Sequence, residues 1–174
     1  MPEIKEIRKF ADFIREKIKN KEILDINILN GRYKNHGPFT NFNVLKKELP
    51  LKVKEVKTKG KFLYIIFDKD LYLFNTMGLT GGWCYLENDK KDKKPKKEYE
   101  FSKNFEDYSK FFPENRLNLY TKNALNHLNV EFKTKQGSLY YFDVLSFGSM
   151  KVVTDQEELN KKLRDFIKSR SSSQ

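Results

Sequence analysis

The first residues of the chain combine a nucleophile with proton donors. Met1 precedes a small residue and is expected to be removed, which would leave Pro2 as an N-terminal secondary amine. The pKa of an α-amino group lies below that of a lysine side chain, so part of this amine is neutral at pH 7. It can attack an electrophilic sugar carbon and form an iminium, while Glu3 or Glu6 moves a proton. The same residues also fit an ordinary helix start stabilised by acidic side chains, and both interpretations stand at this point.

The composition indicates a folded basic protein. Among 174 residues, 35 lysines and arginines outweigh 24 aspartates and glutamates, which gives a formal net charge of +11. The 15 Phe and 9 Tyr can fill a core, unlike the residues of disordered basic tails. Six lysines between Asn88 and Lys97 predict a solvated loop or a phosphate contact. The excess positive charge favours a polyanion partner, most simply nucleic acid.

The same sequence argues against several other classes of protein. One cysteine excludes an internal disulfide and a cysteine-based zinc site, and two histidines argue against a histidine-rich metal centre. No apolar run approaches the ~20 residues of a membrane span. The N-terminus lacks the apolar centre of a signal peptide. We therefore expect a soluble, intracellular protein, cytoplasmic or nuclear, with no metal and no cofactor.

Helices are expected at both ends of the chain, with antiparallel strands between them. Apolar residues at three- and four-residue spacing predict a helix over 3–20, and Thr154 is the expected N-cap of a helix over 155–168. The clearest hairpin joins strands 62–67 and 71–74. Further strands are expected at 23–29, 53–58, 83–86, 129–134 and 137–145. The predicted fold class is α+β, an antiparallel β-sandwich or barrel flanked by N- and C-terminal helices.

A series of short motifs then occurs in an order typical of one protein family. In chain order they are Pro2-Glu3 with Glu6, Asn30-Gly31-Arg32, Thr58-Lys59-Gly60-Lys61-Phe62-Leu63, Met77-Gly78-Leu79-Thr80-Gly81, and Phe142-Asp143 through Phe147-Gly148. This ordered set spans nearly the whole chain. It resembles the formamidopyrimidine-DNA glycosylase/endonuclease VIII family of base-excision repair enzymes.

The resemblance implies chemical roles for the matched residues. Pro2 would attack C1′ of the damaged nucleotide, Glu3 would protonate the sugar ring oxygen, and Lys61 would approach the lesion and its phosphate. Leu79 and Phe147 would fill the gap left by the rotated base, as apolar wedges do.

Further DNA-contacting positions implied by the resemblance are Glu6, Arg32 and Lys59. Lys61 also fits a hairpin-edge lysine that discourages sheet pairing, and Leu79 and Phe147 also fit core residues. Leucine and serine stand at 145 and 146, where the family places two arginines. These side chains cannot reproduce the hydrogen bonds that arginine makes to an orphaned base.

The matched region is expected to form one domain over residues 1–170, with a polar tail at 171–174. Full-length family members continue into a helix–two-turn–helix domain and often a zinc finger, and both are expected to be absent here. The chain would then be a stand-alone catalytic domain, a divergent copy, half of a split enzyme or a truncated form. A partner polypeptide could supply the missing DNA-binding domain.

The function predicted from the sequence is a bifunctional DNA glycosylase and AP lyase that acts on damaged or abasic double-stranded DNA. The alternative is a non-catalytic DNA-binding module, or half of a split glycosylase, in which the fold and charge persist. A third interpretation, an unrelated RNA-binding β domain, would require aromatic side chains on an exposed sheet face.

Overall fold

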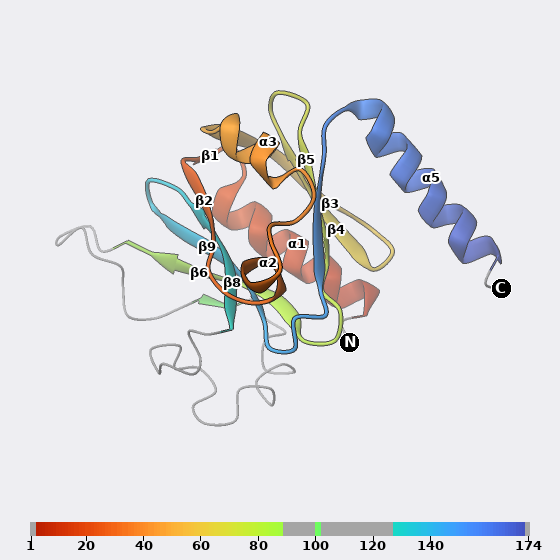
Figure 1. Cartoon of the computed structure of the whole chain (residues 1–174), viewed down its shortest axis with the longest axis horizontal. Coiled ribbons are helices and arrows are strands. Elements are labelled where there is room, and N and C mark those ends of the chain that lie inside the picture. The colour runs from red at the N-terminus through yellow and green to blue at the C-terminus, as the bar shows by residue number, and fades with distance from the viewer. Residues whose placement is uncertain (1–2, 89–99, 102–126, 173–174) are drawn as a thin grey trace.

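Two antiparallel sheets, both in contact with helix α1, make up the computed structural model, which describes residues 3–88, 100–101 and 127–172 (Figure 1). The first sheet has the order β1–β3–β4–β5–β10 and the second β2–β8–β9–β6–β7. Pro2 and most of the lysine-rich segment after Asn88 lie outside the described residues. None of the described helices is long and apolar enough to cross a membrane.

The order of the elements confirms the predicted α+β class with flanking helices. The elements are α1 (Ile4–Ile18), β1 (Glu22–Ile23), β2 (Asp25–Ile28), α2 (Arg32–Asn35), α3 (Phe42–Lys47), β3 (Leu51–Lys59), β4 (Phe62–Phe67), β5 (Tyr72–Thr76), β6 (Gly81–Glu87), β7 (Glu100–Phe101), β8 (Leu128–Lys133), β9 (Gly137–Asp143), β10 (Ser149–Val153) and α5 (Gln156–Ser172).

Helix α1 buries the apolar face that its sequence predicts. The buried side chains are Ile7, Phe10, Ala11, Phe13, Ile14 and Ile18. This face contacts β3 and β4 of the first sheet and β6 and β9 of the second. Burying one large apolar side chain contributes about 1.5–3 kcal/mol. The burial of this face therefore fixes the orientation of α1 relative to both sheets.

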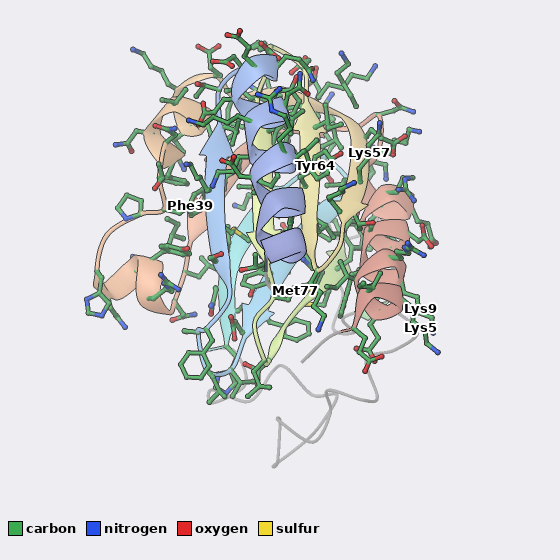
Figure 2. All side chains as sticks on the ribbon, turned by 90° about the vertical axis from the view of Figure 1, so that its right-hand side faces the viewer. Lys5, Lys9, Phe39, Lys57, Tyr64 and Met77 are labelled. Carbon is green, nitrogen blue, oxygen red and sulfur yellow. The ribbon has the colours of Figure 1, made fainter. Side chains whose placement is uncertain are left out.

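The position of β4 between two apolar clusters explains why its sequence is a continuous apolar run. Alternate side chains of a strand point to opposite faces of a sheet. Leu63 and Ile65 belong to the main core, whereas Phe62 and Tyr64 belong to a second cluster that includes Leu159 of α5. Figure 2 shows α5 lying across the outer face of the first sheet, beside Tyr64. Both faces of β4 are therefore covered.

Three local predictions were wrong in detail. The strand expected over 23–29 divides at Leu24, because β1 joins the first sheet and β2 the second. Strand β10 was not predicted, and it forms the edge of the first sheet beside β5. The cap of α5 is Asp155 rather than Thr154, since Asp155 Oδ1 accepts the Glu158 N–H at 2.7 Å.

A half-buried ion-pair cluster fixes α1 against β3. Glu55 accepts Arg15 Nε at 2.7 Å and Lys19 Nζ at 2.9 Å. The backbone N–H of Val56 also donates to Glu55 Oε1 at 2.9 Å. These contacts, led by the Val56 hydrogen bond, lower the pKa of Glu55 from 4.5 to about 2.

Replacing Glu55 with glutamine is expected to flatten the acid limb of the stability profile. Because the pKa is depressed in the folded state, the stabilisation is complete above pH 4.5 and is lost as the pH falls towards 2. Wild type should lose about 1–3 kcal/mol more than Glu55→Gln over this interval, allowing for partial exposure. Urea unfolding at a series of pH values measures the difference.

The matched control is Glu22→Gln, at an exposed position on β1. It should keep the wild-type slope. An unchanged slope in Glu55→Gln would contradict the role of this cluster.

Candidate active site

The strand register brings three connecting segments to one end of the first sheet. Phe62 pairs with Thr76, and Thr76 pairs with Ser149. The turn before β4 and the loops 77–80 and 144–148 therefore lie at the same end of the sheet, which we call the loop end. Figure 1 shows the yellow-green β5–β6 loop beside the blue β9–β10 loop, close to the start of α1.

Helix α1 runs towards this same end. The N–H of Asn20 donates to the Val53 carbonyl at 2.8 Å, and the Arg15 guanidinium donates to the Val56 carbonyl. Helix α1 is therefore antiparallel to β3, and its N-terminal end points towards the C-terminal end of that strand. The part of α1 that precedes Arg15 rises about 16 Å, more than the roughly 10 Å that remains of β3. The first turn of α1 therefore reaches the loop end.

A buried carboxylate joins the two loops. Asp143 is 1% exposed. Its Oδ1 accepts hydrogen bonds from Thr80 Oγ1 at 2.7 Å and the Ser146 N–H at 3.0 Å. Its Oδ2 accepts from the Tyr141 hydroxyl at 2.9 Å and the Gly148 N–H at 2.8 Å. Four donors thus converge on a group that only accepts when ionised, and they fix both loops in one arrangement.

The partners of Asp143 are themselves held in place by burial. Burial, together with the adjacent Asp143 charge, raises the pKa of the Tyr141 hydroxyl well above its usual value, so it remains a donor. The Thr80 hydroxyl also accepts the Leu145 N–H at 2.9 Å. Half-buried His127 accepts the Asp143 N–H on its backbone carbonyl at 2.9 Å, and burial lowers the pKa of its imidazole.

The loops held by Asp143 present three exposed apolar side chains. Leu79, Leu145 and Phe147 are 42%, 45% and 65% exposed. Gly78, which directly precedes Leu79, has a φ of +59°, and a Cβ there would lie 2.8 Å from the carbonyl carbon of Phe147. Only glycine lets the loops approach this closely. Leu79 and Phe147 are therefore surface residues and not core residues, and exposed apolar groups gathered in this way mark interaction sites.

Arg32 supports one of these loops. At the start of α2, its Nη1 donates to the Gly148 carbonyl at 3.2 Å, and its guanidinium lies 5.1 Å from the ring centre of Tyr33. The Tyr33 hydroxyl in turn accepts the Met150 N–H at 2.8 Å. Arg32 thus positions the loop that carries Phe147, and its contact with DNA remains a prediction.

The other predicted site residues lie at the edges of the loop end. Glu3 is exposed before α1, and its backbone N–H donates to Glu6 Oε2 at 3.0 Å, so Glu6 orients the first turn. Lys59 ends β3 half-buried, and Lys61 is exposed in the turn before β4. Pro2 lies outside the described residues, adjacent in sequence to Glu3. Among the described residues, no three His, Cys, Asp or Glu side chains are placed to hold a metal ion.

Comparison with known proteins decides the family. The sequence pattern of the formamidopyrimidine-DNA glycosylase N-terminal domain matches residues 1–150. The chain belongs to this family. A formamidopyrimidine-DNA glycosylase of Wolbachia pipientis is similar to it, 26% identical over 96 residues, which are 54% of this chain and 34% of that protein.

Solved structures of formamidopyrimidine-DNA glycosylase share the fold of this family member. The Lactococcus lactis enzyme in complex with DNA containing an abasic site aligns with a TM-score of 0.63 and 19% identity, over 94% of this chain and 48% of that one. A second Lactococcus lactis complex, bound non-covalently to such DNA, gives 0.63 and 20%, over 96% and 49%. The chain spans about half the length of these structures.

Sequence reasoning found the exposed tips of the two family loops but missed the carboxylate that holds them. Asp143 entered only as part of a matched motif. A signal was present, because an acidic residue that ends the apolar strand β9 must find hydrogen-bond donors if it is buried. Leu145 was considered only for the arginine it replaces, whereas the structure shows it as a third exposed apolar side chain of the loops that carry Leu79 and Phe147.

Replacing Asp143 with asparagine is expected to destabilise the protein. The amide would direct an NH₂ donor at groups that are themselves donors, and one or two of them would be left without an acceptor. The free energy of unfolding should fall by about 2–3 kcal/mol, as measured by urea unfolding at pH 7. Asp12→Asn is the control, since Asp12 forms an exposed ion pair with Arg15 and such pairs contribute little. Equal effects of the two substitutions would contradict the proposed network.

Proposed function

We propose that this chain is the catalytic domain of a DNA glycosylase and AP lyase that acts on damaged or abasic duplex DNA through Pro2. One observation carries the proposal: the start of α1, the Lys61 turn and the two apolar loops meet at one end of the molecule. In this proposal, Pro2, which precedes Glu3 in the chain, would act beside the Lys61 ammonium and the exposed apolar side chains of the two loops. The net charge of +11 suits a phosphate backbone.

The proposed reaction begins with base removal. The Pro2 nitrogen forms a bond to C1′, the bond from C1′ to the base breaks, and the base leaves with the proton of the amine. Glu3 then protonates the ring oxygen, the sugar ring opens, and C1′ becomes an iminium. On an abasic site, the same amine adds to the open-chain aldehyde, and the hydroxyl of the resulting carbinolamine takes a proton from Glu3 and leaves as water.

Strand cleavage follows from the iminium. This group acidifies the C2′ hydrogen, and loss of that proton expels the 3′ phosphate by β-elimination. Water then hydrolyses the iminium and regenerates the Pro2 amine. Lys61 is suited to the phosphate beside the lesion, because its ammonium is a compact charge on an exposed turn.

The wedge belongs to the same proposal. Chemistry at C1′ requires the nucleotide to leave the base stack, at a cost of a few kcal/mol. Leu79, Leu145 and Phe147 supply apolar surface that can occupy the vacated space. The solved relatives are about twice as long as this chain, and in this proposal a further domain or a partner polypeptide provides the second wall of the DNA cleft.

A second candidate function is a DNA-binding module without catalysis. The observation that favours it is the side chain of Leu145, which is 45% exposed and has no hydrogen-bonding group. A module of this kind would bind the duplex through charge and wedge but would form no covalent intermediate.

Borohydride trapping on duplex DNA with one abasic site separates the two candidates. Wild type, shown by mass spectrometry to lack Met1, should form a covalent adduct because borohydride reduces the iminium to a stable amine. Pro2→Gly should reduce the yield at least about tenfold, since it replaces the secondary amine with a primary amine of different geometry.

Lys61→Gln is the companion variant in this experiment. If Pro2→Gly retained the adduct while Lys61→Gln lost it, the nucleophile would be the lysine. If processed wild type bound the duplex without forming an adduct, the binding module would replace the enzyme.

Substituting the wedge should weaken DNA binding without unfolding the protein. Phe147→Ala is expected to lower affinity for abasic duplex roughly tenfold, within the 1–3 kcal/mol typical of a base–aromatic contact. Leu79→Ala should show a smaller loss, and both should keep the wild-type melting temperature because the side chains are exposed. Fluorescence anisotropy measures the affinities. Leu24→Ala, 41% exposed on the chain between β1 and β2, is the control, and an equal loss in that variant would refute a specific wedge.

A further inference from the structure

A pocket lies between α5 and the outer face of the first sheet. Its volume is about 370 Å³. The lining includes two aromatic rings, two hydroxyl groups and two ammonium groups, from Phe62, Phe74, Thr76, Ser149, Lys151 and Lys162. Figure 2 shows α5 in front of the strands that form the other wall, running roughly along them. Because α5 contributes only one wall, the pocket stays open at its side.

Two lysines from different elements lie close to each other in the lining of this pocket. Lys151 lies on β10 and Lys162 on α5. Burial, and then the nearby Lys151 ammonium, lower the pKa of Lys162. Within the described part of the chain, neither lysine forms an ion pair with a carboxylate. Two like charges held together at a half-buried site would be stabilised by a bound anion.

The pocket opens beside the candidate active site. Phe62 directly follows Lys61 in the chain, Thr76 comes three residues before Leu79, and Ser149 comes two residues after Phe147. At about 3.3 Å per residue, Thr76 and Ser149 lie within about 10 Å of Leu79 and Phe147 along the chain. Successive phosphates of one DNA strand advance by 3.4 Å along the duplex axis, so a phosphate a few nucleotides from the lesion is within reach.

We propose that the pocket between α5 and the first sheet binds a phosphate group of the DNA strand held at the active site. The two ammonium groups neutralise the phosphate. The hydroxyl groups of Thr76 and Ser149 bond each other at 2.5 Å, so one of the two hydroxyl protons is left to donate a hydrogen bond to a phosphate oxygen. This inference rests on the proposed function, since it takes the DNA to lie across the loop end. It extends the DNA contact from the loops to α5.

The carboxylate of Asp165 makes it possible to test whether the pocket prefers an anion. This carboxylate also lines the pocket and would repel a phosphate. Asp165→Asn should therefore raise the affinity for DNA, an effect that a damaged fold cannot produce. A pocket built for a cation or a neutral ligand would respond in the opposite way or not at all.

The experiment measures duplex affinity against salt concentration for five proteins. These are wild type, the double variant Lys151→Gln/Lys162→Gln, Asp165→Asn, and two controls, Lys161→Gln and Asn160→Asp, at exposed positions on α5. The double variant should bind roughly fivefold more weakly at physiological salt, and its log–log salt slope should fall by about 0.9, the value for one phosphate. Lys161→Gln should keep the slope, and Asn160→Asp should show that charge on α5 outside the pocket has a smaller effect.

A second arm identifies the source of the phosphate. Melting temperatures of wild type and the double variant are compared in inorganic phosphate and in chloride at equal ionic strength. Phosphate should stabilise wild type more than the double variant. If it does so while the DNA affinities and slopes of the two proteins agree, the pocket takes free phosphate and the DNA assignment is wrong.

Other results would overturn the inference in distinct ways. There would be no anion site if the double variant matched Lys161→Gln in affinity and slope and phosphate stabilised wild type and the double variant equally. If wild type failed to bind duplex DNA, the proposed function would fail, and the phosphate arm would still decide whether the pocket binds an anion.

Discussion

The buried Asp143 carboxylate is the constraint on which the loop end of this protein depends. It accepts hydrogen bonds from Thr80 in one loop and from the Ser146 and Gly148 backbone in the other. A buried charge without partners would cost several kcal/mol, so any movement that removes a donor is strongly unfavourable. Because this carboxylate holds one loop through the Thr80 hydroxyl and the other through its backbone, the apolar side chains of these loops stay exposed.

The exposed tips and the nearby cations are therefore consequences of one arrangement. The antiparallel register of β4, β5 and β10 places the Lys61 turn beside those loops. The burial of α1 against both sheets brings its first turn to the same end. The exposed apolar loops, the Lys61 turn and the first turn of α1 come from segments far apart in the chain, and each is held by a different part of the core.

Helix α5 combines a structural role with the lining of a pocket. Leu159 packs on the outer cluster of the first sheet and closes the apolar face of β4. The same docking brings Lys162 opposite Lys151 and forms the pocket. Packing against apolar surface thus holds together two like charges that would repel each other alone.

The sequence alone determined the helices at both ends, the β4–β5 hairpin and the order of the family motifs. These depend on periodicity and on neighbouring residues, so they can be recognised locally. The division of residues 23–29 between two sheets and the strand β10 could not be seen in this way, because they depend on which sheet receives each segment. The tertiary structure alone decided that Leu79 and Phe147 are exposed and that Asp143 bonds Thr80, 63 residues away. Such contacts arise only when the sheets and loops pack together, since no local pattern specifies which distant donor a buried carboxylate will meet.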